Sequence, residues 1–321
     1  MDCSNFNDII KSAKNILIIS HINPDGDTLG SMCGLYHAIE ENFKKKCDML
    51  VLSKVPKIYE FLPEISRAKL VEMYDKSMVY DLVICVDIAA ENRFEDAKIL
   101  FDKALYTVNI DHHKTNTQYA DLNIVDVNAS SAGELLYGLM KDLKWKINNA
   151  AATCLYTAVL TDTGSFRFSN TTPVTFKTAA DLVAMGVDAV EVYKNCYETN
   201  SKSMVMFQAY CISNAKFVNN DTIAYSIIYK KDMERFSAGD DCTEGLAEKL
   251  RAIETTKVSF IVREIGTRIS KVSMRSKDVD VAEICSVFGG GGHTCAAGCV
   301  IKSAPGTAAN KILDEIKKRK F

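Results

Sequence analysis

Acidic and histidine side chains gather at four places along the 321-residue chain. The stretch SHINPDGDTLGS, residues 20–31, holds a histidine and two aspartates within seven positions, and the tripeptide DHH occupies residues 111–113. A third aspartate ends the apolar run LVICVD at residue 87, and another ends the run ATCLYTAVLTD at residue 162. Carboxylates that share one site repel one another unless cations lie between them. The candidate ligands are His21, Asp25, Asp27, Asp87, His112 and Asp162.

This mixed set of side chains predicts a site for divalent metal ions. Imidazole and carboxylate together suit Mn²⁺, Co²⁺, Fe²⁺ or Zn²⁺ better than Ca²⁺, and the absence of cysteine from the set disfavours structural zinc. Two ions, with one aspartate bridging them, would balance four carboxylates. A pair of ions about 3.5–4 Å apart is the usual arrangement for phosphoryl hydrolysis, in which it generates a hydroxide at neutral pH.

Each of these segments also has an ordinary structural explanation. PDGD alone could be a turn, His21 a loop histidine bonded to backbone, and Asp162 an acid at the end of a helix. These explanations do not account for three predicted strands that all end in potential ligands. We therefore favour the metal site.

The elements that must position these residues alternate between strand and helix. Apolar runs predict strands at 16–20, 47–52, 82–87 and 105–111, and helical patterns occur at 30–41, 131–141, 148–161 and 173–185. This alternation predicts a doubly wound, mainly parallel sheet with helices on both faces. Ligands bind such sheets at the carboxyl ends of the strands, where His21, Asp87 and the DHH tripeptide are expected.

The pattern changes after about residue 200, where strands are predicted at 222–229, 258–265 and 268–275, with helices at 281–288 and about 308–320. A chain of this length is also expected to form two domains. We therefore expect an α/β catalytic domain over residues 1–190, a helical linker over 191–215, and a smaller α/β substrate-binding domain with a mixed sheet over 216–321.

Composition narrows the class of protein. The eleven cysteines form no Cys-x-x-Cys pair, which is typical of reduced thiols in the cytoplasm. No apolar run approaches the roughly 20 residues of a membrane span, and no secretory signal is recognisable. The net charge of −2 argues against a protein that coats long nucleic acid, but it is compatible with a small anionic substrate.

A glycine-rich segment, FGGGGHTCAAG, occupies residues 288–298. No G-x-G-x-x-G register that opens a helix fits it, which excludes a dinucleotide-binding fold. Its backbone N–H groups could approach an anion closely, and His293 could add a side-chain donor. A flexible linker, or zinc bound by His293, Cys295 and Cys299, is a weaker alternative. Between Lys257 and Lys277 there are six basic residues and one acid, for which a solvated strand face is the default explanation.

Taken in order, these motifs resemble those of the DHH phosphoesterase superfamily, and GGGGHTCAAG resembles the signature of its associated C-terminal domain. The resemblance covers essentially the whole chain. The length and layout are most similar to the bacterial nano-RNase and pAp-phosphatase branch, the bifunctional oligoribonucleases. Each motif alone is weak evidence, but the ordered set is highly specific.

The resemblance implies a role for each residue in the first domain. His21 and Asp25 would hold one ion, and Asp27, His112 and Asp162 the other, with Asp87 as the bridge. His113 would act on the scissile phosphate, stabilising charge or protonating the leaving oxygen. Asp111 would orient a ligand histidine.

The second domain would bind the rest of the substrate. SMRS, residues 273–276, resembles the substrate-binding strand of the family, and an arginine there could bind phosphate bidentately. Arg167, in the loop after Asp162, is a further candidate. The expected substrate-binding residues are Arg167, Arg275, Ser276, Gly290, Gly291, Gly292 and His293.

The resemblance implies a cytoplasmic hydrolase that uses two divalent ions, with Mn²⁺ expected and Mg²⁺ or Co²⁺ as alternatives, to activate a bridging hydroxide. It would cut oligoribonucleotides of about two to five nucleotides to mononucleotides, and would dephosphorylate 3′-phosphoadenosine 5′-phosphate (pAp) to AMP. A phosphodiesterase for cyclic di-AMP or pApA is the main alternative, and a nucleotide-sensing module is the non-enzymatic one. Inorganic pyrophosphatase and exopolyphosphatase fit the second domain less well. No long nucleic acid or membrane partner is expected, and a homodimer remains open.

Overall fold

The computed structural model describes residues 4–319. The chain divides between Thr199 and Asn200 into two units, each of which contains its own six-stranded sheet. The division falls inside the segment 191–215 that the sequence predicted as a helical linker. Helix α7 (Ala189–Tyr197) belongs to the first unit, and helix α8 (Lys202–Ser213) belongs to the second.

The sheet of the first unit is wholly parallel, in the order β3-β2-β1-β4-β5-β6. Its central strand β1 is apolar throughout because both faces of the sheet are covered. Ile16 and Ile18 of β1 face one hydrophobic cluster, whereas Leu17 and Ile19 face another. The strands are β1 (Ile16–Ile19), β2 (Asp48–Val51), β3 (Lys69–Leu70), β4 (Leu82–Val86), β5 (Thr107–Asp111) and β6 (Leu122–Val125).

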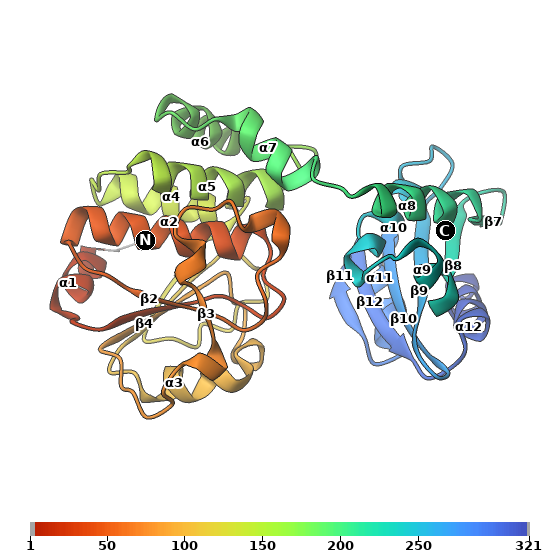
Figure 1. Ribbon diagram of the computed structural model, residues 1–321, viewed down its shortest axis with the longest axis horizontal. Coiled ribbons are helices and arrows are strands. Elements are labelled where there is room, and N and C mark those ends of the chain that lie inside the picture. The colour runs from red at the N-terminus through yellow and green to blue at the C-terminus, as the bar shows by residue number, and fades with distance from the viewer. Residues whose placement is uncertain (1–3, 320–321) are drawn as a thin grey trace. The chain divides into compact units, whose positions relative to one another are not determined.

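Helices cover both faces of this sheet (Figure 1). The larger cluster lies under α1 (Ser4–Ser12), α2 (Gly26–Phe43), α4 (Ala132–Asp142) and α5 (Asn149–Asp162), and α3 (Lys98–Lys103) packs on the opposite face. Helix α6 (Pro173–Ala184) follows α5 in the chain.

Glycines allow α2 and α5 to approach closely. A Cβ at Gly30 would lie 2.5 Å from the carbonyl oxygen of Cys154, and one at Gly26 would lie 2.4 Å from Oγ1 of Thr161. This close approach brings the start of α2, with Asp27, to the end of α5, with Asp162.

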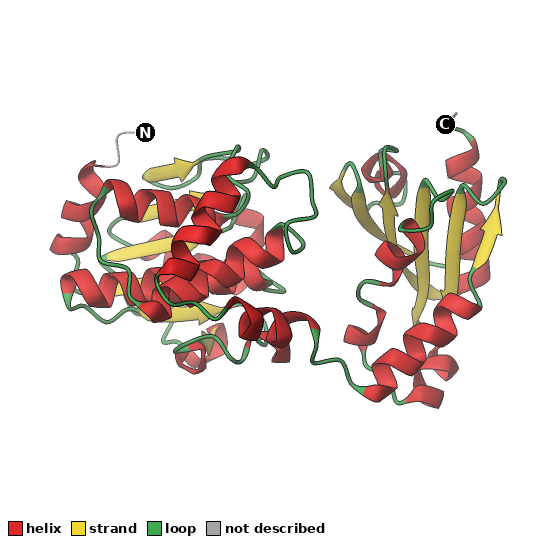
Figure 2. Cartoon of the chain, turned by 90° about the horizontal axis from the view of Figure 1, so that it is seen from above, coloured by secondary structure: helices red, strands yellow, loops and turns green. Residues whose placement is uncertain are grey.

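The second unit has its own sheet, flanked by helices (Figure 2). The sheet is mixed, in the order β11-β12-β10-β9-β8-β7, and within it only β8 and β9 run parallel. Its strands are β7 (Lys216–Val218), β8 (Ile223–Ile228), β9 (Val258–Gly266), β10 (Ile269–Ser276), β11 (Gly291–His293) and β12 (Ala296–Ile301). One face packs on α11 (Val281–Ser286) and α12 (Pro305–Lys317). The other packs on α8 and α10 (Leu246–Arg251), with α9 (Lys230–Phe236) nearby.

The predicted fold class is confirmed, with a parallel sheet in the first unit and a mixed sheet in the second. The seven strands predicted from apolar runs are present with ends shifted by one or two residues. Helix α2 begins four residues earlier than predicted because Asp25 caps it, accepting hydrogen bonds from the backbone N–H groups of Asp27 and Thr28. Within residues 4–319 no helix combines the length and apolar character that crossing a bilayer requires.

Candidate functional site

The predicted ligands of the first unit meet at the carboxyl edge of its parallel sheet. Strands β1, β4 and β5 are neighbours in the sheet and run in the same direction, so the residues that follow them lie side by side. His21 follows β1, Asp87 follows β4, and His112 follows β5. The N-terminus of α2 contributes Asp27, and the last residue of α5 is Asp162.

His21, Asp25 and Asp87 form one group that could hold a cation. Nε2 of His21 lies 3.3 Å from Oδ2 of Asp87 and 3.7 Å from Oδ1 of Asp25. Nδ1 of His21 lies 2.7 Å from the backbone oxygen of Ile22, a contact that places the ring hydrogen on Nδ1. The lone pair of Nε2 therefore points toward the two carboxylates, as a metal ligand requires.

Asp27, His112 and Asp162 form a second group. Nε2 of His112 lies 3.5 Å from Oδ2 of Asp27 and 3.7 Å from Oδ2 of Asp162. Nδ1 of His112 faces the backbone oxygen of Ala129 at 3.3 Å. As in His21, this contact directs Nε2 toward the carboxylates.

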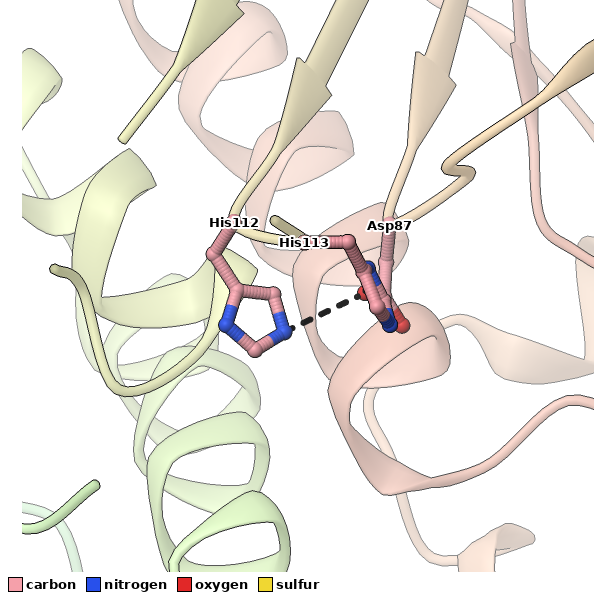
Figure 3. Close-up of side chains that lie close together, drawn as sticks. All are labelled: Asp87, His112 and His113. Atoms are coloured by element: carbon pink, nitrogen blue, oxygen red, sulfur yellow. Dashed lines mark ion pairs between the residues drawn. The ribbon is translucent and has the colours of Figure 1, made fainter. Parts of the chain in front are cut away.

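Asp87 lies between the two groups. Its Oδ2 faces His21, and its Oδ1 lies 3.6 Å from Nε2 of His112 (Figure 3). The residue is 3% exposed and adopts a left-handed backbone conformation (φ 61°), which aspartate tolerates better than most residues. Its Oδ1 atom is buried without a hydrogen-bond partner in the described structure. An orphaned carboxylate oxygen of this kind is costly unless a cation binds it.

The spacing of these side chains fits divalent ions. Nitrogen and oxygen atoms that bind one ion at about 2.0–2.2 Å lie roughly 3–4 Å apart, which matches the separations in both groups. Imidazole and carboxylate donors suit Mn²⁺ and similar ions. The residues present therefore fit a metal centre.

Without a cation, the site holds protons. Burial, together with the charges of Asp87 and Asp25, raises the pKa of Asp162 to about 7, against the opposing effect of His112. Burial also raises the pKa of Asp27 well above its usual range, aided by the charges of Asp87 and Asp162. Burial opposes protonation of His21, but hydrogen bonds and charges from Asp25 and Asp87 outweigh it and raise the His21 pKa to about 10.

Two of the carboxylates are held by groups that the sequence did not reveal. The backbone N–H groups of Ala132 and Gly133, at the start of α4, donate to Asp27 at 2.8 and 3.0 Å. Nδ2 of Asn170 donates to Oδ2 of Asp162 at 3.3 Å and to two backbone oxygens. Asn170 lies in the polar segment SNTT, residues 169–172, but the sequence does not show that its side chain contacts Asp162.

His113 differs from His112 in its partner. Nδ1 of His113 lies 2.7 Å from Oδ1 of Asp111, which is fully buried at the end of β5. The sequence predicted that Asp111 orients a ligand histidine, whereas the structure pairs it with the histidine expected to act on phosphate. Burial opposes protonation of His113, but the Asp111 hydrogen bond and the Asp87 charge raise its pKa to about 9.

Arg167 lies in an unusual loop directly after α5. Gly164, Ser165 and Phe166 all have left-handed backbone conformations, and Nε of Arg167 donates to the backbone oxygen of Gly164 at 2.7 Å. The residue is exposed. The loop thus places the positively charged side chain of Arg167 at the surface, five residues after Asp162 in the chain.

In the second unit, Arg275 and Ser276 lie at the end of β10. Nε of Arg275 pairs with Oε1 of Glu248 at 2.5 Å, and its Nη1 donates to the backbone oxygen of Met274 at 2.9 Å. Ser276 is buried, and its hydroxyl donates to the backbone oxygen of Val279. Arg275 is thus half-buried and oriented, whereas the Ser276 hydroxyl has an internal partner.

The glycine segment forms β11 at the edge of the sheet, paired with β12. A Cβ at Gly290 would lie 2.2 Å from the carbonyl oxygen of Gly298. Gly292 adopts φ 149°, and a Cβ there would lie 2.4 Å from the carbonyl oxygen of Ala296. These two glycines are explained by packing. A Cβ at Gly291 would meet no atom within 4 Å, so packing does not require glycine there. The side chain of His293 lies outside the described part of the structure.

Comparison with known proteins gives matches over both units. Residues 15–159 match the family model described as "DHH family, N-terminal domain", and residues 220–319 match the one described as "DHHA1 domain". The two ranges include all the expected metal ligands except Asp162, which lies three residues after the end of the first match.

Curated relatives match along most of their length. The protein named "Probable bifunctional oligoribonuclease and PAP phosphatase NrnA" from Streptococcus mutans is 32% identical over 290 residues, 90% of each chain. "Bifunctional oligoribonuclease and PAP phosphatase NrnA" from Bacillus subtilis is 30% identical over 292 residues, again 90% of each chain. Among solved structures, an exopolyphosphatase-related protein from Bacteroides fragilis superposes with a TM-score of 0.93 at 26% identity, covering 98% of this chain and 95% of its own.

Proposed function

The chain belongs to the DHH family of phosphoesterases, and from this membership we propose that it hydrolyses oligoribonucleotides of about two to five nucleotides and removes the 3′-phosphate of pAp. The substrates are those named for the relatives from Streptococcus mutans and Bacillus subtilis. The observation that carries the proposal is the orphaned, buried Oδ1 of Asp87 between two groups of ligand-type side chains.

Two divalent ions, with Mn²⁺ as the expected metal, would complete this site. His21 and Asp25 would hold one, Asp27, His112 and Asp162 the other, and Asp87 would be shared between them. When bound, such ions supply Lewis acidity toward the phosphoryl group and the attacking water.

The chain's own residues then orient the substrate and move a proton. The His113 ring, held at Nδ1 by Asp111, would use Nε2 to stabilise charge on the scissile phosphate or to protonate the leaving oxygen. Arg275, Arg167 and the backbone at Gly291 are the groups that would bind the remaining phosphate or base. Ser276 would act by holding the end of β10 in place, because its hydroxyl already has a partner. We place the enzyme in the cytoplasm, where its free thiols would stay reduced.

The test is a substrate panel with added Mn²⁺. It contains pAp, a dinucleotide, 24-nucleotide RNA, pApA, cyclic di-AMP and pyrophosphate, and Asp87→Asn serves as the inactive control. Release of AMP from pAp and of mononucleotides from the dinucleotide is expected, and both must disappear in the control. Preferential turnover of cyclic di-AMP would instead support the di-adenylate activity. Binding of nucleotides without turnover of any of them would support a sensor.

A further inference from the structure

The side chain of Asn116 belongs to the hydrogen-bond network behind His113. A turn brings it there, because the backbone N–H of Asn116 donates to the carbonyl oxygen of His113 at 3.1 Å. Nδ2 of Asn116 then donates to Oδ2 of Asp111 at 2.6 Å. The other oxygen of that carboxylate is the one that contacts Nδ1 of His113, at 2.7 Å. Both carboxylate oxygens of Asp111 thus accept a hydrogen bond.

The orientation of the Asn116 amide is fixed by its other neighbours. Its Oδ1 accepts the backbone N–H of Gln118 at 2.7 Å, so its NH₂ group must face the opposite way. Nδ2 also donates to Oδ1 of Asn109 at 2.7 Å. Asn109 is fully buried on β5, and its own Nδ2 donates to the backbone oxygen of Ile88 at 3.0 Å.

This network anchors Asp111 to the residue that follows the bridging carboxylate. Ile88 comes directly after Asp87, and the backbone N–H of Thr117 donates to the oxygen of Ala89 at 2.9 Å. Within this network Nδ2 of Asn116 and Nδ1 of His113 both face Asp111, which therefore accepts on both oxygens and holds the hydrogen of His113 at Nδ1.

We propose that Asn116 is a positioning residue for the reaction: it holds the Asp111 carboxylate so that the His113 ring presents Nε2 to the substrate. The inference rests on the proposed function, in which His113 acts on the scissile phosphate. Asn116 contacts none of the six expected metal ligands in the described structure, so its effect should pass through His113 alone.

The test uses Asn116→Ala and the isosteric Asn116→Asp, which keeps an acceptor for Gln118 but removes the donor to Asp111. Both should lower kcat by roughly 10–100-fold while KM changes less than about threefold, since positioning acts on the proton-transfer step. Bound Mn²⁺ per chain should stay at the wild-type value. Asn123→Ala is the matched control: among the described residues this side chain bonds only to the backbone of Ala120, so the substitution should leave kcat unchanged.

A double-mutant cycle separates positioning from folding. In the His113→Ala background, adding Asn116→Ala should change kcat less than about twofold, because the ring it positions is gone. An equal loss in both backgrounds would overturn the proposal.

The imidazole tautomer provides a readout that does not depend on activity. In ¹⁵N spectra recorded with Mg²⁺ at a pH above the His113 pKa of about 9, where the ring is neutral, His113 should carry its hydrogen on Nδ1 in the wild type and lose this preference in both variants. An unchanged tautomer would overturn the positioning role. If the wild type hydrolyses none of the panel, the proposed function fails, while these spectra still decide the role of Asn116.

Discussion

Oδ1 of Asp87 lies 3.6 Å from Nε2 of His112, and no hydrogen bond within the described structure satisfies this buried oxygen. The distance is too long for a hydrogen bond and suits two ligands of one ion. The opposite oxygen of the same carboxylate stands in a similar relation to His21, at 3.3 Å. Asp87 is therefore the residue whose loss should matter most.

Asp87→Asn and Asp87→Ala should both lower turnover by about 10³-fold or more, because each removes the carboxylate proposed to be shared by two ions. Asparagine tolerates the left-handed backbone at this position, so Asp87→Asn should keep the wild-type melting temperature of the metal-free protein. Steady-state kinetics, elemental analysis and calorimetry check these points. Activity within tenfold of wild type at saturating Mn²⁺ would refute the two-metal assignment.

His113→Ala should lower kcat by roughly 10²-fold, since it removes the group proposed to act on the scissile phosphate. Bound Mn²⁺ should remain near two ions per chain by elemental analysis. His112→Ala is the natural comparison, because it should lose an ion. If His113→Ala also loses an ion, His113 is itself a ligand.

Mn²⁺ should stabilise the protein more at about pH 7.5 than at about pH 5. Burial raises the Asp162 pKa from 3.8 to about 7, so the folded, metal-free protein binds a proton that the unfolded chain has released. Its stability therefore falls as pH rises through that window, and an ion removes the penalty by pairing with the ionised carboxylate. Melting temperatures with and without Mn²⁺ at both pH values measure the effect. A shift of equal size at both would contradict it.

Gly290→Ala and Gly291→Ala should have opposite consequences. A Cβ at Gly290 meets the carbonyl oxygen of Gly298, so this variant should lose about 1–3 kcal/mol of stability. Gly291→Ala should fold normally, but kcat/KM for nucleotides should fall roughly tenfold if an anion approaches the backbone there. Thermal melts and kinetics on one preparation of each variant distinguish them. Wild-type kinetics for Gly291→Ala would remove this residue from the substrate site.

Arg275→Ala should lower kcat/KM for short nucleotides by the equivalent of about 1.5–3 kcal/mol, the usual contribution of a charge-assisted hydrogen bond. Its effect on a minimal chromogenic phosphodiester should be small. Glu248→Gln serves as the control, because it keeps the guanidinium while removing the charge that orients it. Equal impairment of both substrates would argue against a substrate contact.

Efficiency should also fall steeply for RNA longer than about five nucleotides, because a net charge of −2 offers no extended basic track for the overhang. Rates on dinucleotide and 24-nucleotide RNA under one set of conditions check this. Comparable efficiency on both would contradict it.

The sequence predicted the strands of the first sheet well because buried parallel strands are continuous apolar runs, as in Ile16–Ile19 and Leu82–Val86. It predicted the meeting of His21, Asp87 and His112 for the same reason, since neighbouring parallel strands end at one edge. It did not identify β3 or β6, because Lys69–Leu70 has two residues and Leu122–Val125 is only partly buried.

The sequence did not predict which hydrogen-bond partners the polar side chains have. Asp111 could have supported either histidine that follows it, and only the 2.7 Å distance between its Oδ1 and Nδ1 of His113 shows which one it contacts. Ser276 is a polar residue in a basic strand, yet it points inward to Val279. Such choices depend on side-chain direction relative to neighbouring elements, which strand and helix periodicity does not encode.

Each hydrophobic cluster in the described structure draws its residues from one unit only. Each half of the chain should therefore be able to fold around its own hydrophobic core when it is joined to a different partner half. Residues 200–321 could be exchanged for the matching half of a relative without disturbing the core of the first unit. If the second unit selects the nucleotide, as proposed, such hybrid chains would take their chemistry from one parent and their choice of nucleotide from the other.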